Sequence, residues 1–523
     1  MADSFDYSLV GQLQAQPAAA WRDDLPPYDF GDAHGSAAEL IVDSRLQSFR
    51  LGTGASIFVS ALLPAMLVAR HEIIVVTCFW APSKSLEGLS AALARLAATR
   101  REQQRQQGPG PSSKSTLRIR ICFSSRTLVQ KLLHTASADG CVYPAATWSS
   151  QLGLPPATVL HEAGIDLAVK SLFFRPLSVM HPKMVLIDRH RAFLPSCNIS
   201  WEPWLEGCVE LTGPVIRPLL SFYARTWGDD LPPLEVLSGA VEAGDVAESA
   251  ETAPSACATA DTRSTTTISP LDVDGPGSIV VGFSPDAAPI HTMVLPSSHH
   301  CNPAFRPFPW QHAPPPPPTP LNLALLQLFE TARKNIFVQT PNVTSQPAVT
   351  ALLNVLSRGV DVDIVTGRSM MVLEQLVTSG TTTARYLRGW IRRYEALRPD
   401  TLCGKLRIWY FHPLRRASVS VERPVAVGDE EQAILPAVTA TSTNESGFAV
   451  DSDEPVQSHL KLTIVDGEHT VLGSGNMDRA SWFTSQELGI LFHDAAVASA
   501  VRTAVDRVLD GRLEPMYPSA HAS

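Results

Sequence analysis

Lysine, paired cysteines and long hydrophobic runs are all scarce in this sequence, and each shortage narrows what the protein can be. Only 8 of its 523 residues are lysines, and the formal net charge at pH 7 is −9. A chain with this charge lacks the general basic surface typical of nucleic-acid-binding proteins, although arginines could still form a local basic groove. Nucleic acid is therefore the less favoured partner.

The cysteines and the apolar runs argue against secretion and against a membrane span. The chain has 8 cysteines and no CxxC pair, which indicates scattered thiols in a reducing compartment. The first 21 residues, MADSFDYSLVGQLQAQPAAAW, lack the basic start and apolar stretch of a signal peptide. The longest apolar run, Ile57–Arg70, is shorter than the roughly 18 residues of a membrane helix. We expect a cytoplasmic protein.

Composition divides the chain into two halves joined by linkers. Polar or acidic segments low in large apolar residues are predicted to be linkers or insertions at 100–115, 231–275 and 417–456. The proline run at 313–320 is predicted to be a stiff spacer, or alternatively a ligand for an SH3-like partner. The predicted organisation is an N-terminal extension at 1–47, a first half at 48–230, the linker at 231–275 and a second half at 276–515.

The two halves repeat one order of helices and strands. An apolar helix followed by a β-branched strand is predicted at 61–83 and again at 323–345. A second helix follows each, at 89–99 and 349–359, and then a strand at 117–125 and 360–367. This is an internal duplication of a βα unit. It predicts an α/β fold with a parallel or mixed sheet covered on both faces.

One polar pattern is present in both halves. The first copy reads MHPKMVLIDRHRAFLPSCN from Met180, and the second reads SHLKLTIVDGEHTVLGSGN from Ser458. The first motif is His181, Lys183, Asp188, Ser196 and Asn198, and the second motif, 278 positions later, is His459, Lys461, Asp466, Ser474 and Asn476.

The residue types of the motifs suit a phosphodiester. Alternation along a strand places the histidine and lysine of each motif side by side on one face. Imidazole can act as nucleophile or proton donor near neutral pH. Ammonium and amide groups donate hydrogen bonds to phosphoryl oxygens. Such a site requires no metal and no cofactor.

A single His-x-Lys-(x)4-Asp match occurs by chance in roughly one chain per hundred, so one copy alone would fit a plain surface strand. Two copies at equivalent places of a duplicated fold do not fit that alternative. The extended pattern His-x-Lys-(x)4-Asp-(x)6-Gly-Ser-x-Asn is similar to the signature of the phospholipase D superfamily, and the resemblance covers roughly 48–227 and 276–512. The runs VTCFWAPS, LPSCNISWEPWLEGCVELTG and SGNMDRASWFTSQELG most resemble fungal phospholipase D-like and nuclease-like proteins.

The resemblance implies two α-β-α sandwich halves packed as a pseudo-dimer, with the active site at their interface and a covalent phosphohistidine intermediate. One of His181 and His459 would attack phosphorus and the other would protonate the leaving oxygen, and family usage favours His181 as the nucleophile. The other motif residues take implied roles in phosphoryl binding (Lys183, Lys461, Asn198, Asn476), in shaping the turn (Ser196, Ser474) and in bracing the loop (Asp188, Asp466).

In the family an acidic residue further along orients each histidine. Glu210 and Glu487 lie 29 and 28 residues after their histidines and fit that place, the alternative being surface carboxylates. The first motif departs from the pattern at Pro195, where the second has Gly473. Proline removes a backbone N–H and fixes φ, which predicts a differently shaped first turn.

Three tryptophans near the motifs and one histidine-containing segment have alternative interpretations. Trp201, Trp204 and Trp482 would line a lipid or base pocket, or belong to the core. The SSHHC segment, 297–301, has metal-ligand residue types without a second cluster and is predicted to be a loop.

The leading hypothesis is a phospholipase D-type phosphodiesterase acting on phospholipids by hydrolysis or phosphatidyl transfer. A cardiolipin synthase-like phosphatidyltransferase and a nuclease of the same superfamily stay open, as does a catalytically silent lipid-binding or scaffold protein. Expected partners are the phosphodiester substrate and a transient membrane surface, with no obligate protein partner. The substrate head group, and the choice between hydrolysis and transfer, are left open.

Overall fold

The computed structural model describes residues 2–15, 37–107, 116–127, 130, 140–174, 178–228, 230–233, 270–271, 278–284, 286–297, 315–368, 370–397, 403–414, 441–443, 449–451 and 454–518. Most of the predicted linker at 231–275, most of the predicted insertion at 417–456 and residues 298–301 of the SSHHC segment lie outside the described residues.

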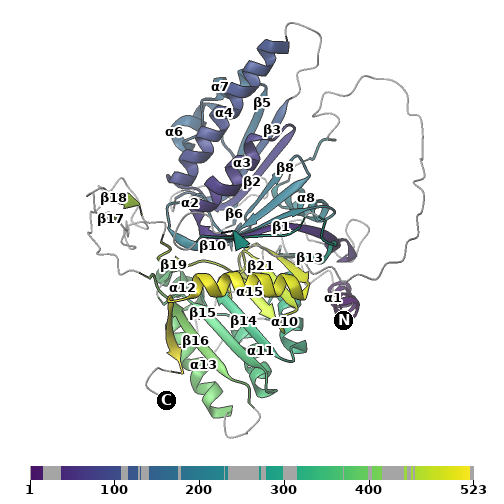
Figure 1. Cartoon of the computed structure of the whole chain (residues 1–523), viewed down its shortest axis with the longest axis vertical. Helices are drawn as coiled ribbons and strands as arrows, with labels where there is room; N and C mark the ends of the chain where they lie inside the picture. Colours follow the sequence, from purple (N-terminus) through teal and green to yellow (C-terminus); the bar gives the residue numbers. More distant parts are fainter. Residues whose placement is uncertain are drawn as a thin grey trace, which may run out of the picture.

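The first half is a mixed sheet with helices packed on it (Figure 1). Its pairings give the strand order β4-β5-β3-β2-β8-β9-β10-β1. The strands are β1 (Ile41–Thr53), β2 (Glu72–Phe79), β3 (Leu117–Ser125), β4 (Cys141–Val142), β5 (Ile165–Ser171), β8 (Met184–Ile187), β9 (Arg191–Pro195) and β10 (Trp204–Thr212). The helices are α2 (Gly54–Ile57), α3 (Leu63–Leu67), α4 (Lys84–Gln107), α6 (Trp148–Leu152), α7 (Ala157–Glu162) and α8 (Ile216–Trp227).

The second half repeats this order as β23-β16-β15-β14-β20-β21-β22-β13. The strands are β13 (Ile290–Ser297), β14 (Asn335–Thr340), β15 (Asp361–Thr366), β16 (Leu406–Phe411), β20 (Leu462–Val465), β21 (His469–Gly473), β22 (Glu487–His493) and β23 (Leu513–Tyr517). The helices are α10 (Pro320–Thr331), α11 (Gln346–Ser357), α12 (Val372–Ser379), α13 (Thr383–Leu397), α14 (Arg479–Phe483) and α15 (Ala495–Leu509). The predicted mixed α/β fold is confirmed.

The halves are joined through their sheets and their last helices. The start of β1 pairs with β13, and β10 pairs in parallel with the short strand β19 (Gln457–Ser458) just before the second motif. Helix α15 packs on β1 and on β12 (Ile279–Gly282), while α8 packs on β13. Figure 1 shows α15 lying along the boundary between the purple-blue and the green parts. One hydrophobic core cluster contains residues of both halves, and a second lies within the first half.

Two boundaries differ from the sequence prediction. Strand β1 begins at Ile41, before the predicted start of the first half at 48. Helix α4 continues to Gln107, so the first part of the segment 100–115 is helix and not linker. Arg101 holds this end of the helix by bonding Val159 O at 2.9 Å and Glu162 at 2.6 Å. Arginine and glutamine are good helix formers, which explains why a polar stretch extends the helix.

The proline run leads into helix α10. Thr319 caps the helix by accepting the Asn322 N–H at 3.3 Å, and Pro320 occupies the first helical turn, where its missing N–H costs nothing. The spacer role stays a prediction. Among the described residues, no helix is both long enough and apolar enough to cross a bilayer.

Candidate active site

The fold brings the two motifs together. The rings of His181 and His459 lie 6.5 Å apart between centroids, edge to face at 84°. Both residues are buried, at 8% and 2% exposure. Each histidine and lysine precedes its strand, since β8 begins at Met184 and β20 at Leu462.

Backbone pairing between the halves positions each histidine. His181 N–H donates to Gln486 O at 3.1 Å, and His459 N–H donates to Leu205 O at 2.8 Å. Gln486 and Leu205 each precede a glutamate on the opposite half. The same geometry is thus built twice, once on each side of the interface.

Each histidine takes its carboxylate partner from the other half. His181 Nδ1 lies 2.8 Å from Glu487 Oε2, and His459 Nδ1 lies 2.8 Å from Glu206 Oε1. Both glutamates are buried. A carboxylate on Nδ1 fixes the ring orientation and leaves Nε2 as the ring nitrogen that can react.

The assignment of Glu210 as an orienting residue is wrong. Glu210 accepts a hydrogen bond from Ser48 at 3.2 Å and pairs with Arg191 at 2.5 Å, away from both histidines. Glu206 holds the equivalent place, because Pro195 pairs with Cys208 in the first half as Gly473 pairs with Gly489 in the second. The segment between the paired strands is three residues shorter in the first half than in the second. Counting a similar number of residues from each histidine therefore leads to Glu210 and misses Glu206. Glu487 does orient a motif histidine, but it is His181.

The two motif serines brace these glutamates. Ser196 Oγ donates to Glu206 and accepts the Gly207 N–H at 2.9 Å. Ser474 Oγ donates to Glu487 at 2.5 Å and accepts the Leu488 N–H at 3.0 Å. Each serine therefore holds its carboxylate at the start of the strand that carries it.

The motif lysines are buried beside the histidines, and the two pairs differ. Lys183 Nζ donates to His181 O at 2.8 Å. Lys461 Nζ donates to His459 O at 2.7 Å and also lies 2.8 Å from Nε2 of the same ring. The second histidine therefore has its Nε2 occupied by an ammonium group.

The motif asparagines lie at the turns that follow. Asn198 Oδ1 accepts the Phe79 N–H at 3.3 Å. Asn476 Nδ2 donates to Asp478 at 3.0 Å, and its buried Oδ1 has no hydrogen-bond partner among the described residues. Asp478 was not singled out from sequence. Its position at the N-cap of α14, three residues before Ser481, is the signal that could have found it.

The motif aspartates brace a turn at the far end of the strand. Asp188 accepts backbone N–H groups of Arg70, His71 and Glu72, and its φ is 50°. Asp466, at φ 56°, accepts the equivalent groups of residues 333–335. Positive φ is tolerated by aspartate, which also satisfies three donors of the neighbouring chain here.

Burial controls the electrostatics of the site. Desolvation raises the pKa of Glu206 and of Glu487 to about 7 and lowers that of Lys461 to about 7. The pKa of each motif histidine is pushed well below its usual value by burial and by the two nearby lysines. Burial and the two lysines therefore favour the neutral form of both imidazoles, and neutral imidazole is the form that can act as a nucleophile.

Pro195 leaves the strand pairing unchanged. Ser196 N–H donates to Gly207 O at 2.8 Å, as Ser474 N–H donates to Leu488 O at 3.0 Å. Gly473 itself has φ +155°, and a Cβ there would meet Leu488 O at 2.3 Å. The difference between the halves lies after this point, where α14 is present in the second loop and no helix is assigned between β9 and β10.

The three tryptophans have different surroundings. Trp482 is buried in the core, and Trp201 is 43% exposed against the ring edge of Phe79. Trp204 lies over His459, with 4.9 Å between ring centroids. Only Trp204 touches a motif histidine.

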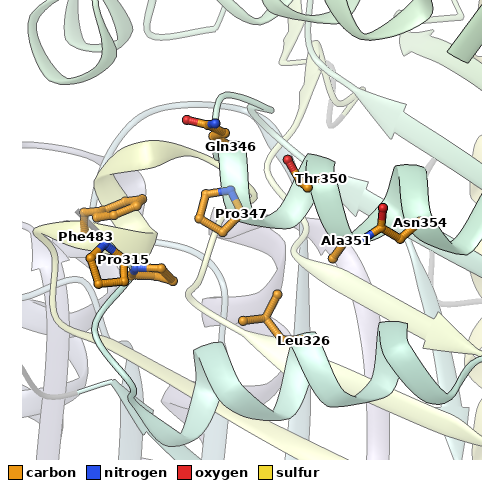
Figure 2. Close-up of a pocket in the computed structure, with 9 residues that line it drawn as sticks. Pro315, Leu326, Gln346, Pro347, Thr350, Ala351, Asn354 and Phe483 are labelled. Carbon is orange, nitrogen blue, oxygen red and sulfur yellow. The ribbon is translucent and has the colours of Figure 1, made fainter. Parts of the chain in front are cut away.

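A separate groove of about 390 Å³ lies on the second half (Figure 2). Leu326 of α10, Pro347 of α11, Phe483 of α14 and the prolines at 315 and 316 line it. None of its lining residues belongs to the motifs. In the described part of the chain, metal-ligand side chains gather once, as Asp6, His291 and His493, none of which belongs to the motifs.

Comparison with known proteins gives one family model that matches part of the chain. Residues 325–509 match the family model described as "Cardiolipin synthase, PLD-like domain". No curated protein matches the chain in sequence.

Two of the solved structures to which the chain is similar are a synthase and a phospholipase D family member. Phosphatidylserine synthase from Haemophilus influenzae Rd KW20 is 12% identical with a TM-score of 0.49, over 91% of this chain and 89% of that chain. Nuc from Salmonella typhimurium, a phospholipase D family member, is 16% identical with a TM-score of 0.24, over 43% of this chain and 96% of that chain. The family model covers residues 325–509 and leaves the first half of the chain outside its match.

Proposed function

We propose that the chain is a phospholipase D-type phosphodiesterase that acts on phospholipids through a phosphohistidine intermediate. One observation carries the proposal: two neighbouring histidines are each hydrogen-bonded to a carboxylate of the opposite half. Attack and protonation at one phosphorus require two imidazoles held in this way.

His181 is the proposed nucleophile. Its side chain is 10% exposed, against 3% for His459, so substrate reaches it more readily. Nδ1 is held by Glu487, while the Nε2 of His459 is occupied by Lys461. Attack by Nε2 of His181 forms a P–N bond and breaks the P–O bond to the leaving alcohol.

His459 and Lys461 supply the proton. With its pKa lowered to about 7, the Lys461 ammonium can pass a proton to Nε2 of His459 across 2.8 Å. The imidazolium then protonates the leaving oxygen. In the second step water or an alcohol gives its proton to His459, attacks phosphorus and breaks the P–N bond. Lys183, Asn198 and Asn476 are proposed to bind the phosphoryl oxygens.

A lipid substrate is favoured by an apolar stripe on helix α12. Its large hydrophobic residues are exposed by 39% to 52%, namely Val372, Leu373, Leu376 and Val377. Helix α13 follows directly and presents exposed arginines at 385, 388, 392 and 393. Apolar side chains beside cationic ones are typical of helices that bind an anionic membrane surface.

This stripe lies close to the second motif. Gln375 of α12 accepts the Thr383 N–H at 2.6 Å, and Thr383 Oγ1 accepts the Val343 N–H at 3.1 Å. Val343 forms a bridge with Met477, the residue after Asn476. Helix α12 also packs on α14. A membrane bound at α12 would thus deliver lipid beside the proposed site.

A transfer assay tests the function. Purified protein is incubated with labelled phospholipids and a primary alcohol, next to the variants His181→Ala and His459→Ala. His190→Ala, an exposed histidine outside the motifs, is the matched control. We expect a phosphatidyl alcohol from the wild type and the control alone, and a labelled phosphoprotein that His181→Ala lacks.

The alternatives give different results in the same assay. Transfer to a lipid acceptor in place of the alcohol would indicate a phosphatidyltransferase, which the description of the family model favours. Cleavage of oligonucleotides but of no lipid would replace the lipid proposal with a nuclease. Binding of lipid without any product would indicate a silent binder. A closer relation to fungal proteins stays a prediction.

A further inference from the structure

A partly buried cluster of metal-ligand side chains lies where the N-terminal helix meets the sheet. Asp6 is on α1 (Ala2–Gln14), His291 is on β13 and His493 ends β22. Their ligand atoms all lie within 4.8 Å of one another. The side chains are 9%, 29% and 3% exposed. The three residues come from segments far apart in sequence, so only the tertiary fold assembles them.

His493 points a bare nitrogen at this cluster. Its Nε2 is buried and has no hydrogen-bond partner among the described residues. The facing Asp6 Oδ1 is 3.6 Å away, too far for a hydrogen bond. A tetrahedral ion with bonds of about 2.1 Å holds neighbouring ligand atoms roughly 3.4 Å apart. The gap therefore has the size that an ion between the two atoms requires. The other carboxylate oxygen of Asp6 contacts His291 Nε2.

The surroundings orient the His493 imidazole as a ligand, and a carboxylate lies near the second ring nitrogen of His291. His493 Nδ1 lies 2.8 Å from Nδ1 of His469 on β21, which can accept its proton and leave Nε2 unprotonated. His291 Nδ1 faces Asp43 of β1 at 3.9 Å. Histidines that bind metals usually direct the second ring nitrogen at such a partner. Phe5 covers the cluster, with its ring 5.2 Å from that of His493.

We propose that Asp6, His291 and His493 bind one divalent ion of the zinc class, with a water as fourth ligand. Two imidazoles and one carboxylate suit zinc better than magnesium or calcium, which prefer oxygen ligands. The ion does not take part in phosphodiester chemistry. His493 and Glu487 are at opposite ends of β22, about 20 Å apart. Its role is to fasten α1 to β13 and β22.

Apolar packing and hydrogen bonds to α10 also hold helix α1. Leu9 and Leu13 are buried against the core, and Gln327 of α10 donates to Phe5 O at 3.0 Å. An ion bound to these three residues would link α1 to two strands of the second half and raise the stability of the fold. This added stability would be lost when a ligand is replaced or the ion is removed.

The test measures zinc and stability in the full chain without a histidine tag. The protein is stripped with a chelator and titrated with Zn²⁺, and bound metal is counted by mass spectrometry. We expect one equivalent per chain and a melting temperature raised by at least about 3 °C. His493→Gln and Asp6→Asn should each lose both effects. His161→Gln, an exposed histidine on α7, should keep them.

Cobalt provides a second measurement should a variant fail to fold. Co²⁺ added to stripped wild-type protein should give the visible absorption of a tetrahedral ion, and Zn²⁺ should abolish it. Failure of the wild type to bind either ion would overturn the proposal and leave a metal-free hydrogen-bonded cluster. Unchanged zinc content in His493→Gln would place the ion elsewhere. Neither outcome depends on phosphodiesterase activity.

Discussion

The carboxylate on each motif histidine is the residue-scale feature that distinguishes an organised site from two polar turns. His181 and His459 use opposite halves for this contact, and a serine fixes each glutamate in turn. Without the carboxylate, the ring can rotate and change tautomer, and Nε2 would lose the orientation that the proposed attack on phosphorus requires.

Replacing these glutamates should therefore lower activity far more than stability. We expect Glu206→Gln and Glu487→Gln to reduce kcat by about 100-fold or more, as loss of the orienting carboxylate does in other histidine sites. Steady-state kinetics on the transfer reaction gives the effect, and thermal unfolding shows whether the fold is kept.

Glu210→Gln is the matched control, because Glu210 is a glutamate of the same strand β10 that bonds Arg191 and Ser48 instead. Its kcat should stay within about twofold of the wild type. A loss at Glu210 equal to that at Glu206 would contradict the assignment.

The buried charges predict a bell-shaped pH dependence of kcat/KM centred near pH 7. Glu206 and Glu487 have pKa values raised to about 7, so they become ionised and orient the histidines only as the pH rises through 7. Lys461 has a pKa lowered to about 7, so it loses the proton it donates as the pH rises further. The limbs belong to the coupled cluster and not to single residues.

Lys461→Arg tests whether Lys461 supplies the proton. Arginine stays protonated over the whole pH range and cannot pass a proton to His459, so kcat/KM should fall by about 100-fold or more at every pH. An unchanged kcat/KM profile in this variant would assign the alkaline limb to a group other than Lys461.

At the scale of elements, the loops after the two motifs set the halves apart. The second loop contains α14, which begins at the N-cap Asp478 and packs on α12. The first loop is shorter and ends in Trp204, whose ring lies over His459. The site is therefore not symmetric, although the strands that carry it are.

The stripe on α12 should bind anionic membranes. We expect the double change Leu373→Gln and Leu376→Gln to weaken binding to vesicles with phosphatidylserine by about tenfold, since each removes apolar area from the lipid interface. Vesicle sedimentation measures it. Cleavage of a short-chain soluble substrate should be unaffected, because neither residue belongs to the motifs.

Val59→Asn and Val68→Asn in the first half serve as the matched control, since these valines are 62% and 66% exposed. Vesicle binding by this pair should equal that of the wild type. Equal loss in both pairs would mean that general surface apolarity governs the interaction and that α12 has no special part in it.

At the scale of the whole molecule, neither half is complete. The second half lacks Glu206, the partner of His459, and the strand β1 that covers β13 and packs against α15. Separate expression of residues 276–523 should therefore give a protein that is inactive and that unfolds at a lower temperature than the full chain. Circular dichroism and the transfer assay check both.

Mixing that fragment with residues 1–275 is the complementary measurement. Recovery of activity on mixing is expected if the fragments reassociate through β1, β13 and β10. An isolated second half with full activity would contradict a site shared between halves.

Sequence alone determined the mixed α/β fold, the repeated order of helices and strands, and the positions of the ten motif residues, whose catalytic roles stay predictions. These depend on local patterns: hydrophobic periodicity indicates helices and strands, and residue types limit the chemistry. The motif aspartates are an example. The family pattern implies that they brace a loop, and each accepts backbone N–H groups from a neighbouring segment. The expected placement of each motif histidine and lysine within a strand was wrong, because β8 and β20 begin after them.

Only the tertiary structure decided which groups meet across the halves. Glu206, Trp204 and Asp478 became part of the site through strand register and loop length, which differ between the halves by a few residues. The triad of Asp6, His291 and His493 joins residues nearly 500 positions apart. Local spacing carries no information on such contacts, because they depend on where three separate elements come to rest on one sheet.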